Sequence, residues 1–317
     1  MNIKKLTALI LGACLSLGIV FSGCTQKKEI AEKREILSSG GEVVFIDDEG
    51  NEITLKEPLK RIISLYSAHT ENLFAIGAGD CLIGASKTSV YPFEAALLPR
   101  FDYKADPETV IASEPDAVLI RPFVSKKAPD FVEALKTAGI RVISLYPNSL
   151  DDFESYIQTL GAMTGKEEEA KLCLSEFWDS LEEIREKSSS IEDKKTIFFE
   201  STEKDLRTVT EGSLAGKAIE LAGGINAAKG AKAVSETSSI ASFGAEKLLE
   251  KADEIDVYVS QRGAMNTGGN EHSISIRPGF DTIKAIKEGK ILLINEKLIS
   301  SPTFRYVKGV SELARFM

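Results

Sequence analysis

Histidine, cysteine and tryptophan are scarce in this 317-residue chain, which contains two His, four Cys and one Trp. A site for bare zinc or manganese needs several converging His or carboxylate ligands, so two histidines argue against such a site. The motifs H-E-x-x-H, G-x-S-x-G and C-x-x-C are also absent from the sequence. We therefore expect no catalytic residue, no metal-binding residue and no resident cofactor, and we expect that the protein is not an enzyme.

A basic stripe is missing as well. The formal net charge is −9, and 43% of the residues are hydrophobic. Nucleic-acid-binding proteins concentrate Lys and Arg on one face, so an acidic chain without such a stripe argues against a nucleic-acid partner. The length and the apolar content predict about two domains with cores of their own.

The first 24 residues have the composition of an export signal. Lys4 and Lys5 precede an apolar run over residues 6–21, an order that is typical of secretory signal peptides. The segment ends Phe21-Ser22-Gly23-Cys24, which resembles a lipobox, and a plain cleaved signal is the alternative. We predict that residues 1–24 are a lipoprotein signal peptide and that acylated Cys24 anchors the protein at the outer face of the cell membrane.

Residues 25–40 are polar and charged, and they are predicted to form a flexible tether. Two cysteines, Cys81 and Cys173, remain in the rest of the chain. Sequence alone does not assign a disulfide between them, and two free buried thiols are the alternative.

Residues 41–150 alternate short apolar runs with helical segments. A hairpin is predicted from Val43–Ile46 and Glu52–Leu55, which are joined by turn residues. The further predicted elements are strands at Arg61–Leu65, Cys81–Ala85, Ala117–Ile120 and Val142–Leu145 and helices at Thr70–Ile76 and Pro129–Ala138. This alternation predicts a parallel sheet covered by helices, which is an N-terminal α/β lobe.

Residues 151–190 are predicted to bridge two lobes. One helix is expected at Leu150–Met163, and a longer, uninterrupted helix at Thr164–Lys187. In the longer helix apolar residues recur at i, i+3, i+4 and i+7, and its length is roughly 33 Å. Thr164 and Glu167 have the spacing of a capping box.

Residues 191–317 repeat the alternation of the first lobe. The predicted elements are strands at Thr196–Phe199, Arg207–Thr210, Val257–Ser260 and Ile291–Ile294 and helices at Leu214–Ala222, Ala245–Ala252, Phe280–Ile286 and Phe304–Phe316. Residues 263–270 are too rich in Gly to form a regular element. The predicted fold is α/β, with two Rossmann-like lobes that contain parallel-rich sheets and are bridged by a single long α-helix.

The two lobes share a weak internal repeat. Ala105–Ile120 and Phe243–Val259 each contain an acid early in a short helix, then an apolar pair, an acidic turn and a buried strand. The acids are Glu108 and Glu246. Equivalent acids on two equivalent lobes suggest a partner that is itself two-fold.

Four segments together resemble the substrate-binding lipoproteins of type II ABC importers, the family of siderophore-, haem- and cobalamin-binding proteins. The segments are Arg61–Ser86, Ala105–Ile120, Arg277–Asn295 and Ser301–Phe316. Their order and spacing carry the resemblance, which covers almost all of the chain after the signal. The resemblance implies two α/β lobes on one long helix, with the ligand in a cleft between the lobes.

Ligands of open α/β sheets lie at the carboxyl ends of the strands. This rule and the resemblance place a set of polar, basic and aromatic residues at the cleft. The expected ligand-binding residues are Ser67, His69, Tyr91, Tyr103, Arg121, Phe123, Arg262 and Arg305. The arginines are expected to pair with carboxylate, catecholate or phosphate oxygens, and the aromatic rings to pack on a flat macrocycle.

The resemblance also implies the function and the partners. The ligand is expected to be a small-molecule metal chelate, first of all an iron(III)–siderophore complex, with a corrinoid or haem as alternatives; its iron or cobalt would be cargo. The partners are expected to be an ABC permease and its ATPase, with Glu108 and Glu246 docking onto the permease. We expect a monomer that contacts the membrane through its lipid anchor.

Two other classes of protein compete with this interpretation. One is an extracytoplasmic enzyme, such as a metal-dependent lyase or a chelatase on the same lobes, which a turnover assay would separate from a binding protein. The other is a structural or adhesin-like surface lipoprotein, which would neither bind a ligand nor close.

Overall fold

The computed structural model describes residues 36–39, 41–236, 238–267 and 269–317, and these belong to one compact unit. The predicted signal peptide, the acylated Cys24 and most of the predicted tether lie outside the described residues. Within the described part of the chain, we find no helix that combines the length and the apolar character needed to cross a membrane.

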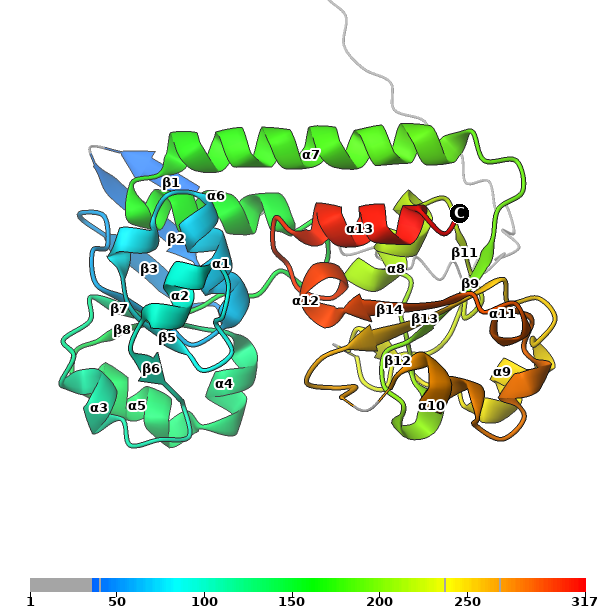
Figure 1. Cartoon of the computed structure of the whole chain (residues 1–317). Coiled ribbons are helices and arrows are strands. Elements are labelled where there is room, and N and C mark those ends of the chain that lie inside the picture. The colour runs from blue at the N-terminus through cyan, green and yellow to red at the C-terminus, as the bar shows by residue number, and fades with distance from the viewer. Residues whose placement is uncertain (1–35, 40, 237, 268) are drawn as a thin grey trace, which may run out of the picture. The chain divides into compact units, whose positions relative to one another are not determined.

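The N-terminal lobe is built on a five-stranded parallel sheet in the order β6-β5-β4-β7-β8 (Figure 1). The strands are β4 (Ile62–Ser64), β5 (Leu82–Ser86), β6 (Arg100–Phe101), β7 (Ala117–Ile120) and β8 (Arg141–Ser144). All residues of β4 and β7 are buried, as expected for central strands with helices on both faces. The helices are α1 (Ser67–Ala75), α2 (Phe93–Leu97), α3 (Glu108–Ile111), α4 (Pro122–Lys127), α5 (Pro129–Thr137) and α6 (Phe153–Thr164), with a 3-10 turn η1 (Gly79–Cys81).

The predicted hairpin is confirmed, because β2 (Glu42–Ile46) pairs antiparallel with β3 (Glu52–Leu55). The last residues of the predicted flexible tether instead form a strand. Ile36–Ser39 forms β1, which pairs antiparallel with β2. Half-buried Ile36 packs against the main core cluster, so an apolar contact recruits these residues to the sheet.

The C-terminal lobe contains a second parallel sheet of four strands in the order β11-β9-β13-β14. The strands are β9 (Thr196–Glu200), β11 (Ile225–Asn226), β13 (Val257–Arg262) and β14 (Ile291–Asn295). The segment predicted as a strand at Arg207–Thr210 instead contributes β10 (Thr208–Val209) to a separate antiparallel ribbon with β12 (Ile240–Ala241). The helices are α8 (Leu214–Leu221), α9 (Ala245–Glu250), α10 (Glu271–Ser275), α11 (Lys284–Lys287), α12 (Glu296–Ile299) and α13 (Tyr306–Ala314), with 3-10 turns η2 (Lys204–Leu206) and η3 (Phe280–Thr282).

The long helix is α7 (Glu167–Ser189), with 23 residues. It contacts α6 of the N-terminal lobe and α8 and α13 of the C-terminal lobe, and Figure 1 shows it running alongside α6 and α13. Its buried apolar face includes Leu174, Phe177 and Leu181. Phe177 contacts Phe153 of α6, with ring centroids 4.7 Å apart, and Phe304, at 5.9 Å. The predicted α/β fold with two parallel-rich sheets is therefore confirmed.

The predicted capping box at the start of this helix is wrong. Thr164 is the last residue of α6, and its Oγ1 donates to the Leu160 carbonyl at 2.7 Å. Gly165 follows with φ 66°, which ends α6 in the left-handed conformation that glycine adopts readily. Thr164 therefore ends α6, and the chain turns at Gly165 before α7 begins at Glu167, whereas the sequence predicted that the long helix begins at Thr164.

Candidate functional site

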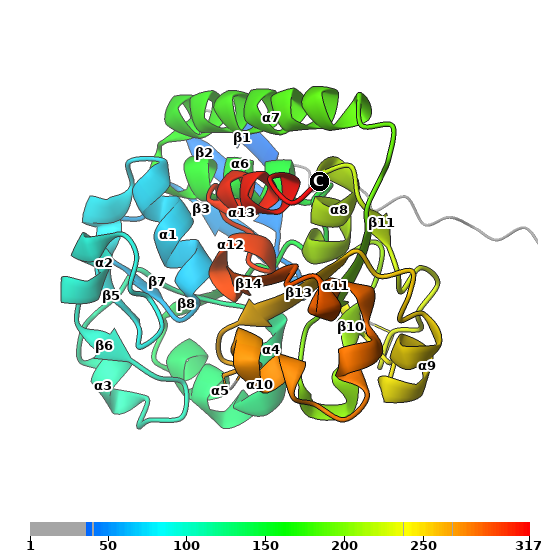
Figure 2. The ribbon, with the colours of Figure 1, turned by 45° about the vertical axis from the view of Figure 1, so that its right-hand side comes forward.

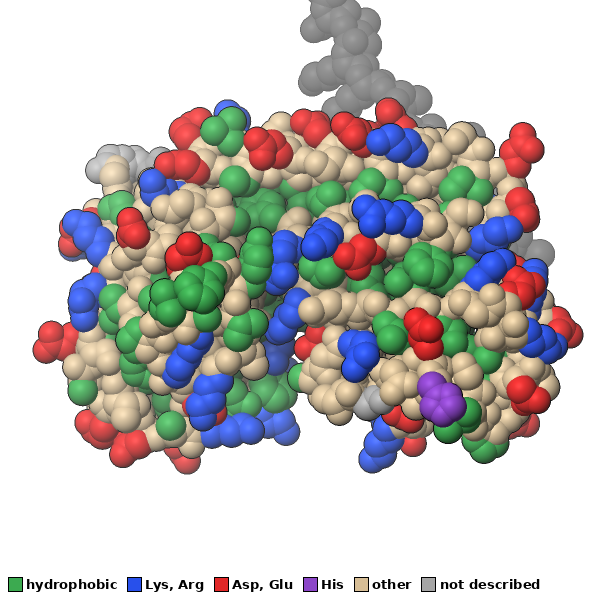
Figure 3. All heavy atoms as spheres, viewed as in Figure 1, with side chains coloured by type: hydrophobic (Ala, Val, Ile, Leu, Met, Phe, Trp, Pro, Cys, Tyr) green, Lys and Arg blue, Asp and Glu red, His purple; other side chains and the backbone are tan. Residues whose placement is uncertain are grey.

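A pocket of about 430 Å³ lies between the two lobes and is lined by both of them. We call it the main pocket. The carboxyl ends of the strands meet there, because Tyr66 and Ser67 follow β4, Arg121 follows β7, and Lys297 follows β14. The space-filling view shows the hollow between the lobes and the Lys and Arg side chains gathered along it (Figure 3). This is the position at which open α/β sheets bind ligands.

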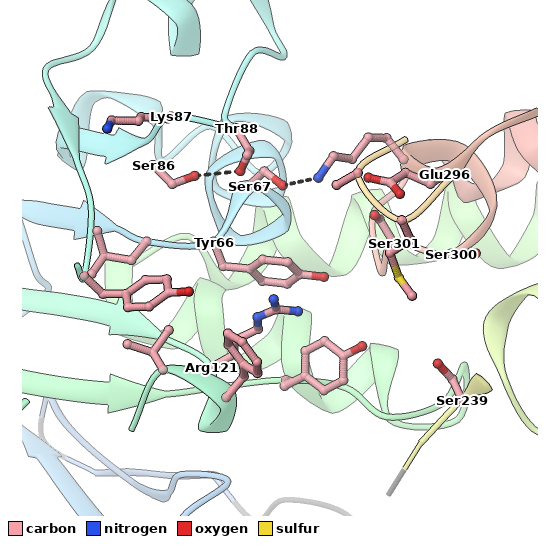
Figure 4. A pocket seen from close by; sticks show the side chains of 18 of the residues that line it. Tyr66, Ser67, Ser86, Lys87, Thr88, Arg121, Ser239, Glu296, Ser300 and Ser301 are labelled. Atoms are coloured by element: carbon pink, nitrogen blue, oxygen red, sulfur yellow. Dashed lines mark hydrogen bonds between the residues drawn. The ribbon is translucent and has the colours of Figure 1, made fainter. Parts of the chain in front are cut away.

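Arg121 is surrounded by aromatic rings. Its guanidinium carbon lies 4.8 Å from the ring centroid of Tyr66, 5.0 Å from that of Phe123 and 6.0 Å from that of Tyr146. In Figure 4 the guanidinium lies directly below the Tyr66 ring. Among the described residues, its side chain has no hydrogen-bond or ion-pair partner, so its N–H donors are available to a ligand.

Lys297 brings a second cation to the pocket, from the opposite lobe. Its Nζ donates to Ser67 Oγ at 2.8 Å, a hydrogen bond that joins α12 to α1 (Figure 4). Burial lowers the pKa of the Lys297 ammonium below its ordinary value; Glu296 and Glu71 oppose this shift, while the nearby Arg121 and Arg305 add to it. The ammonium is therefore poorly solvated, and an anion placed beside it would stabilise its charge.

The charged side chains of the main pocket are mostly basic. Its described lining contains four basic residues, Lys87, Lys104, Arg121 and Lys297, and two acidic residues, Asp102 and Glu296. Lys87 pairs with Asp102 at 3.6 Å. Arg121 and Lys297 have no carboxylate partner among the described residues. A pocket with unpaired cations and aromatic walls is suited to an anionic ligand with flat faces.

The phenols beside Arg121 remain protonated. Burial raises the pKa of Tyr66 well above its ordinary value and also raises that of Tyr146, although Arg121 opposes the shift in both residues. Both tyrosines therefore present neutral hydroxyl groups and apolar ring faces to the pocket at physiological pH.

Four of the eight expected ligand-binding residues line the main pocket: Ser67, Tyr103, Arg121 and Phe123. His69 does not, contrary to the expectation. It is fully buried, with Nδ1 2.7 Å from the Tyr156 hydroxyl and Nε2 3.0 Å from the Ile120 carbonyl. Its ring therefore ties α1 to the core of the N-terminal lobe.

Tyr91, Arg262 and Arg305 also lie outside the pocket lining. Arg305 donates to both carboxylate oxygens of Glu71 in α1, and its guanidinium carbon lies 3.8 Å from the Tyr91 ring centroid. Glu71, Tyr91 and Arg305 thus form a contact between the lobes. Arg262 is exposed at the end of β13.

The sequence reasoning missed Tyr66, Tyr146 and Lys297. Each lies two residues after the end of a parallel strand: β4, β8 and β14 respectively. The rule that ligands lie at strand carboxyl ends would have found them if it had been applied to every strand.

The Gly-rich segment 263–270 was predicted to form no regular element, and part of it is nevertheless fastened to the lobe. Asn266 is buried, and its Nδ2 donates to Glu200 Oε1 at 2.8 Å. Burial alone would raise the pKa of the Glu200 carboxyl, but hydrogen bonds from Arg277 and Tyr258 outweigh it, so the pKa is lowered. This buried carboxylate anchors Asn266, and the residue before it, Met265, lines the main pocket.

The paired acids of the internal repeat occupy matching positions. Glu108 is in the first turn of α3 and Glu246 in the first turn of α9, and both are exposed. In Figures 1 and 2, α3 and α9 lie on the side of their lobes away from α7.

The described residues contain no group of three or more His, Cys, Asp and Glu side chains arranged to hold a metal ion. Cys81 and Cys173 are both free and partly buried, which settles the choice between a disulfide and two thiols. The Cys173 thiol donates to the Ala75 carbonyl at 3.5 Å.

Comparison with known proteins identifies the family. A family model described as periplasmic binding protein matches residues 62–298. The chain is 26% identical over 317 residues to YvrC of Bacillus subtilis (strain 168), an uncharacterized ABC transporter substrate-binding lipoprotein, with 98% of this chain and 96% of YvrC covered. It is 28% identical over 258 residues to the vitamin B12-binding protein of Vibrio campbellii, with 81% and 88% covered.

Among solved structures, a possible iron-binding (periplasmic solute-binding) protein from Staphylococcus epidermidis matches with a TM-score of 0.70 and 24% identity, covering 82% of this chain and 99% of that one. At this identity the match supports the fold alone. Members of the matched family are substrate-binding proteins, in agreement with the prediction that this protein is not an enzyme. The chain belongs to the periplasmic binding protein family.

Proposed function

We propose that the protein is the extracytoplasmic solute-binding component of an ABC importer and that its main pocket takes an anionic metal chelate, first of all an iron(III)–siderophore complex. The observation that carries this proposal is a pair of cations, Arg121 and Lys297, that have no carboxylate partner among the described residues. They reach one pocket from two lobes of a chain whose formal net charge is −9.

The chemistry of the pocket fits such a chelate. The planar fork of Arg121 matches carboxylate and catecholate oxygens, and each charged hydrogen bond contributes about 1.5–3 kcal/mol. The rings of Tyr66, Phe123 and Tyr146 supply faces for the flat, aromatic parts of a catecholate ligand. Because Arg121 and Lys297 belong to different lobes, one anionic ligand can contact both lobes at once.

A corrinoid is the second candidate, and the 28% identity to a vitamin B12-binding protein favours it. The same aromatic residues would pack on the corrin ring, but a corrinoid would depend less on the two cations. Haem is the remaining alternative from the sequence. The dependence of affinity on Arg121 therefore separates a chelate of high negative charge from a stacked macrocycle.

A binding assay tests the proposal. The purified protein is titrated with a ferric tris-catecholate, a ferric hydroxamate, cyanocobalamin and haemin, and the quenching of protein fluorescence gives each Kd. We expect the ferric tris-catecholate to bind and Arg121→Ala to weaken it by about 10-fold or more. Arg141→Ala, an exposed arginine at the start of β8, is the matched control. Binding of cyanocobalamin alone, unaffected by Arg121→Ala, would replace the proposal with the second candidate.

The proposed location and partners follow from the family and the sequence. The relation to an ABC transporter substrate-binding lipoprotein supports anchoring through acylated Cys24 at the outer face of the cell membrane. It also supports a membrane permease with its ATPase as the receiving partner. We place the docking surface at Glu108 and Glu246, one acid on each lobe, and we propose that the protein works as a monomer.

A further inference from the structure

A second cavity, which we call the side pocket, adjoins the main pocket. It has a volume of about 330 Å³, and its lining includes Tyr146, Asn148, Thr210 and Ser239. Tyr146 and Ser239 also line the main pocket. A small cavity of about 30 Å³ shares Tyr146 and Ser239 with both pockets and Asn148 with the side pocket. The two pockets therefore share part of their walls, and Ser239, labelled in Figure 4 among the residues of the main pocket, belongs to the shared part.

The side pocket has a different chemistry from the main pocket. Among the described residues, no Lys or Arg lines it, and Glu236 is the one charged side chain in the lining. Most of the remaining lining groups are hydroxyls and an amide. Because a second anionic group would meet no cation here and would face Glu236, the side pocket disfavours negative charge.

Three of its polar groups are available to a ligand. Among the described residues, the Asn148 side-chain amide, the Ser239 hydroxyl and the Tyr146 hydroxyl have no hydrogen-bond partner. Ser213 is different, since its Oγ accepts from Gly216 N at 3.0 Å and caps α8. The available groups include donors and acceptors, a set that recognises neutral hydroxyl or amide groups.

We propose that the side pocket binds an uncharged, hydroxyl- or amide-bearing arm of the ligand whose anionic chelate lies in the main pocket. This inference rests on the proposed function and narrows the substrate class to chelates that carry a neutral polar substituent. Asn148 comes from the N-terminal lobe and Ser239 from the C-terminal lobe, so the arm contacts both lobes beyond the chelate itself. Asn148, which lines the side pocket but not the main pocket, then determines specificity without contacting the metal-binding groups of the chelate.

The test compares two probes that differ only in the arm: a ferric tris-catecholate and the same chelate bearing glucosyl substituents. We expect the glucosylated chelate to bind the wild type more tightly by about 5-fold, the size of one neutral hydrogen bond. Asn148→Ala should reduce this advantage and leave the Kd of the plain chelate unchanged, because Asn148 lines the side pocket but not the main pocket. Gln158→Ala, which removes an exposed amide on α6 outside both pockets, is the matched control.

Thermal unfolding of each variant verifies that it is folded. Equal Kd values for the two chelates in the wild type would overturn the side-pocket inference and leave the proposed function intact. The inference would also be overturned if Asn148→Ala weakened both chelates equally. If neither chelate bound the wild type, the proposed function itself would fail.

Discussion

Arg305 donates two hydrogen bonds to Glu71, with Nε–Oε1 at 2.6 Å and Nη2–Oε2 at 2.5 Å, and so fastens the segment that precedes α13 to α1 of the other lobe. The Glu71 side chain is 8% exposed and that of Arg305 is 25% exposed. Planar, two-point pairing of this kind is the strongest form of ion pair between side chains. The contact holds the two lobes together beside the main pocket, independently of α7.

Arg305→Ala should lower the free energy of unfolding by about 2 kcal/mol, because it removes charged hydrogen bonds and leaves Glu71 without its partner. Urea unfolding followed by circular dichroism measures the change. Arg141→Ala, at an exposed site, is the control and should stay within about 0.5 kcal/mol of the wild type. Equal stability of the two variants would show that the pair contributes nothing to the fold.

Phe177→Ala should destabilise the protein by about 3–5 kcal/mol, the usual range for deleting a buried aromatic side chain. Phe177 is 3% exposed, and it contacts Phe153 on one side and Phe304 on the other. Leu172→Ala on the same helix removes a side chain that is 64% exposed and should have little effect. If Phe177→Ala lowered the free energy of unfolding by less than about 1 kcal/mol, the packing of Phe177 on Phe153 and Phe304 would contribute little to the attachment of α7.

Lys297→Met should weaken a ferric tris-catecholate by about 10-fold or more while leaving the free energy of unfolding equal to that of the wild type or slightly higher. The reason is that the ammonium is half-buried and its solvation is lost on folding. Isothermal titration and urea unfolding measure the two effects, with Lys171→Met on the exposed face of α7 as control. Parallel losses of stability and affinity would contradict this account.

The same residue predicts a pH dependence. The folded-state pKa of Lys297 is lowered from 10.5, so between the two values the unfolded chain binds more protons than the folded chain. Stability of the wild type relative to Lys297→Met should therefore rise as pH increases through this alkaline window, whereas affinity for the anionic chelate should fall. A pH-independent difference between the two proteins would show that Lys297 stays charged throughout.

Glu108→Arg combined with Glu246→Arg should abolish uptake in cells without changing fold or ligand affinity. Exposed acids steer encounter with a partner and set its orientation more than they stabilise a fold. Glu168→Arg combined with Glu186→Arg makes the same charge change on exposed positions of α7 and should leave uptake normal. If the docking variant imported ligand normally at normal surface levels, the two acids would act only at the starts of their helices.

Periodicity and strand alternation predicted most of the fold because each signal is local. The fully buried runs of β4 and β7 and the apolar stripe of α7 could be recognised within a few residues. The helix start was misplaced because Thr164 has the spacing of a capping residue, while the chain uses its hydroxyl inside α6. Only the tertiary turn at Gly165 decides between these roles.

The site was predicted less completely, because burial and pairing depend on distant residues. Arg121 follows the apolar strand β7, whereas Arg305 follows Ser301-Pro302-Thr303-Phe304. Glu71 pairs with Arg305 from 234 positions away, and aromatic rings surround the guanidinium of Arg121. Histidine is a common ligand-binding residue type, but the ring of His69 is bonded to the Tyr156 hydroxyl and the Ile120 carbonyl inside the N-terminal lobe. No local pattern distinguishes these outcomes.

Arg121 and Lys297 lie just beyond the last paired residues of β7 and β14, outside the hydrogen-bonded ladders of both sheets. Neither residue belongs to a core cluster. The proposed preference for anionic cargo therefore depends on side chains outside the scaffold, so substituting them should leave the sheets intact. Exchanging both cations for carboxylates would convert the same scaffold into a receptor for positively charged cargo, which makes this pocket a starting point for engineered sensors.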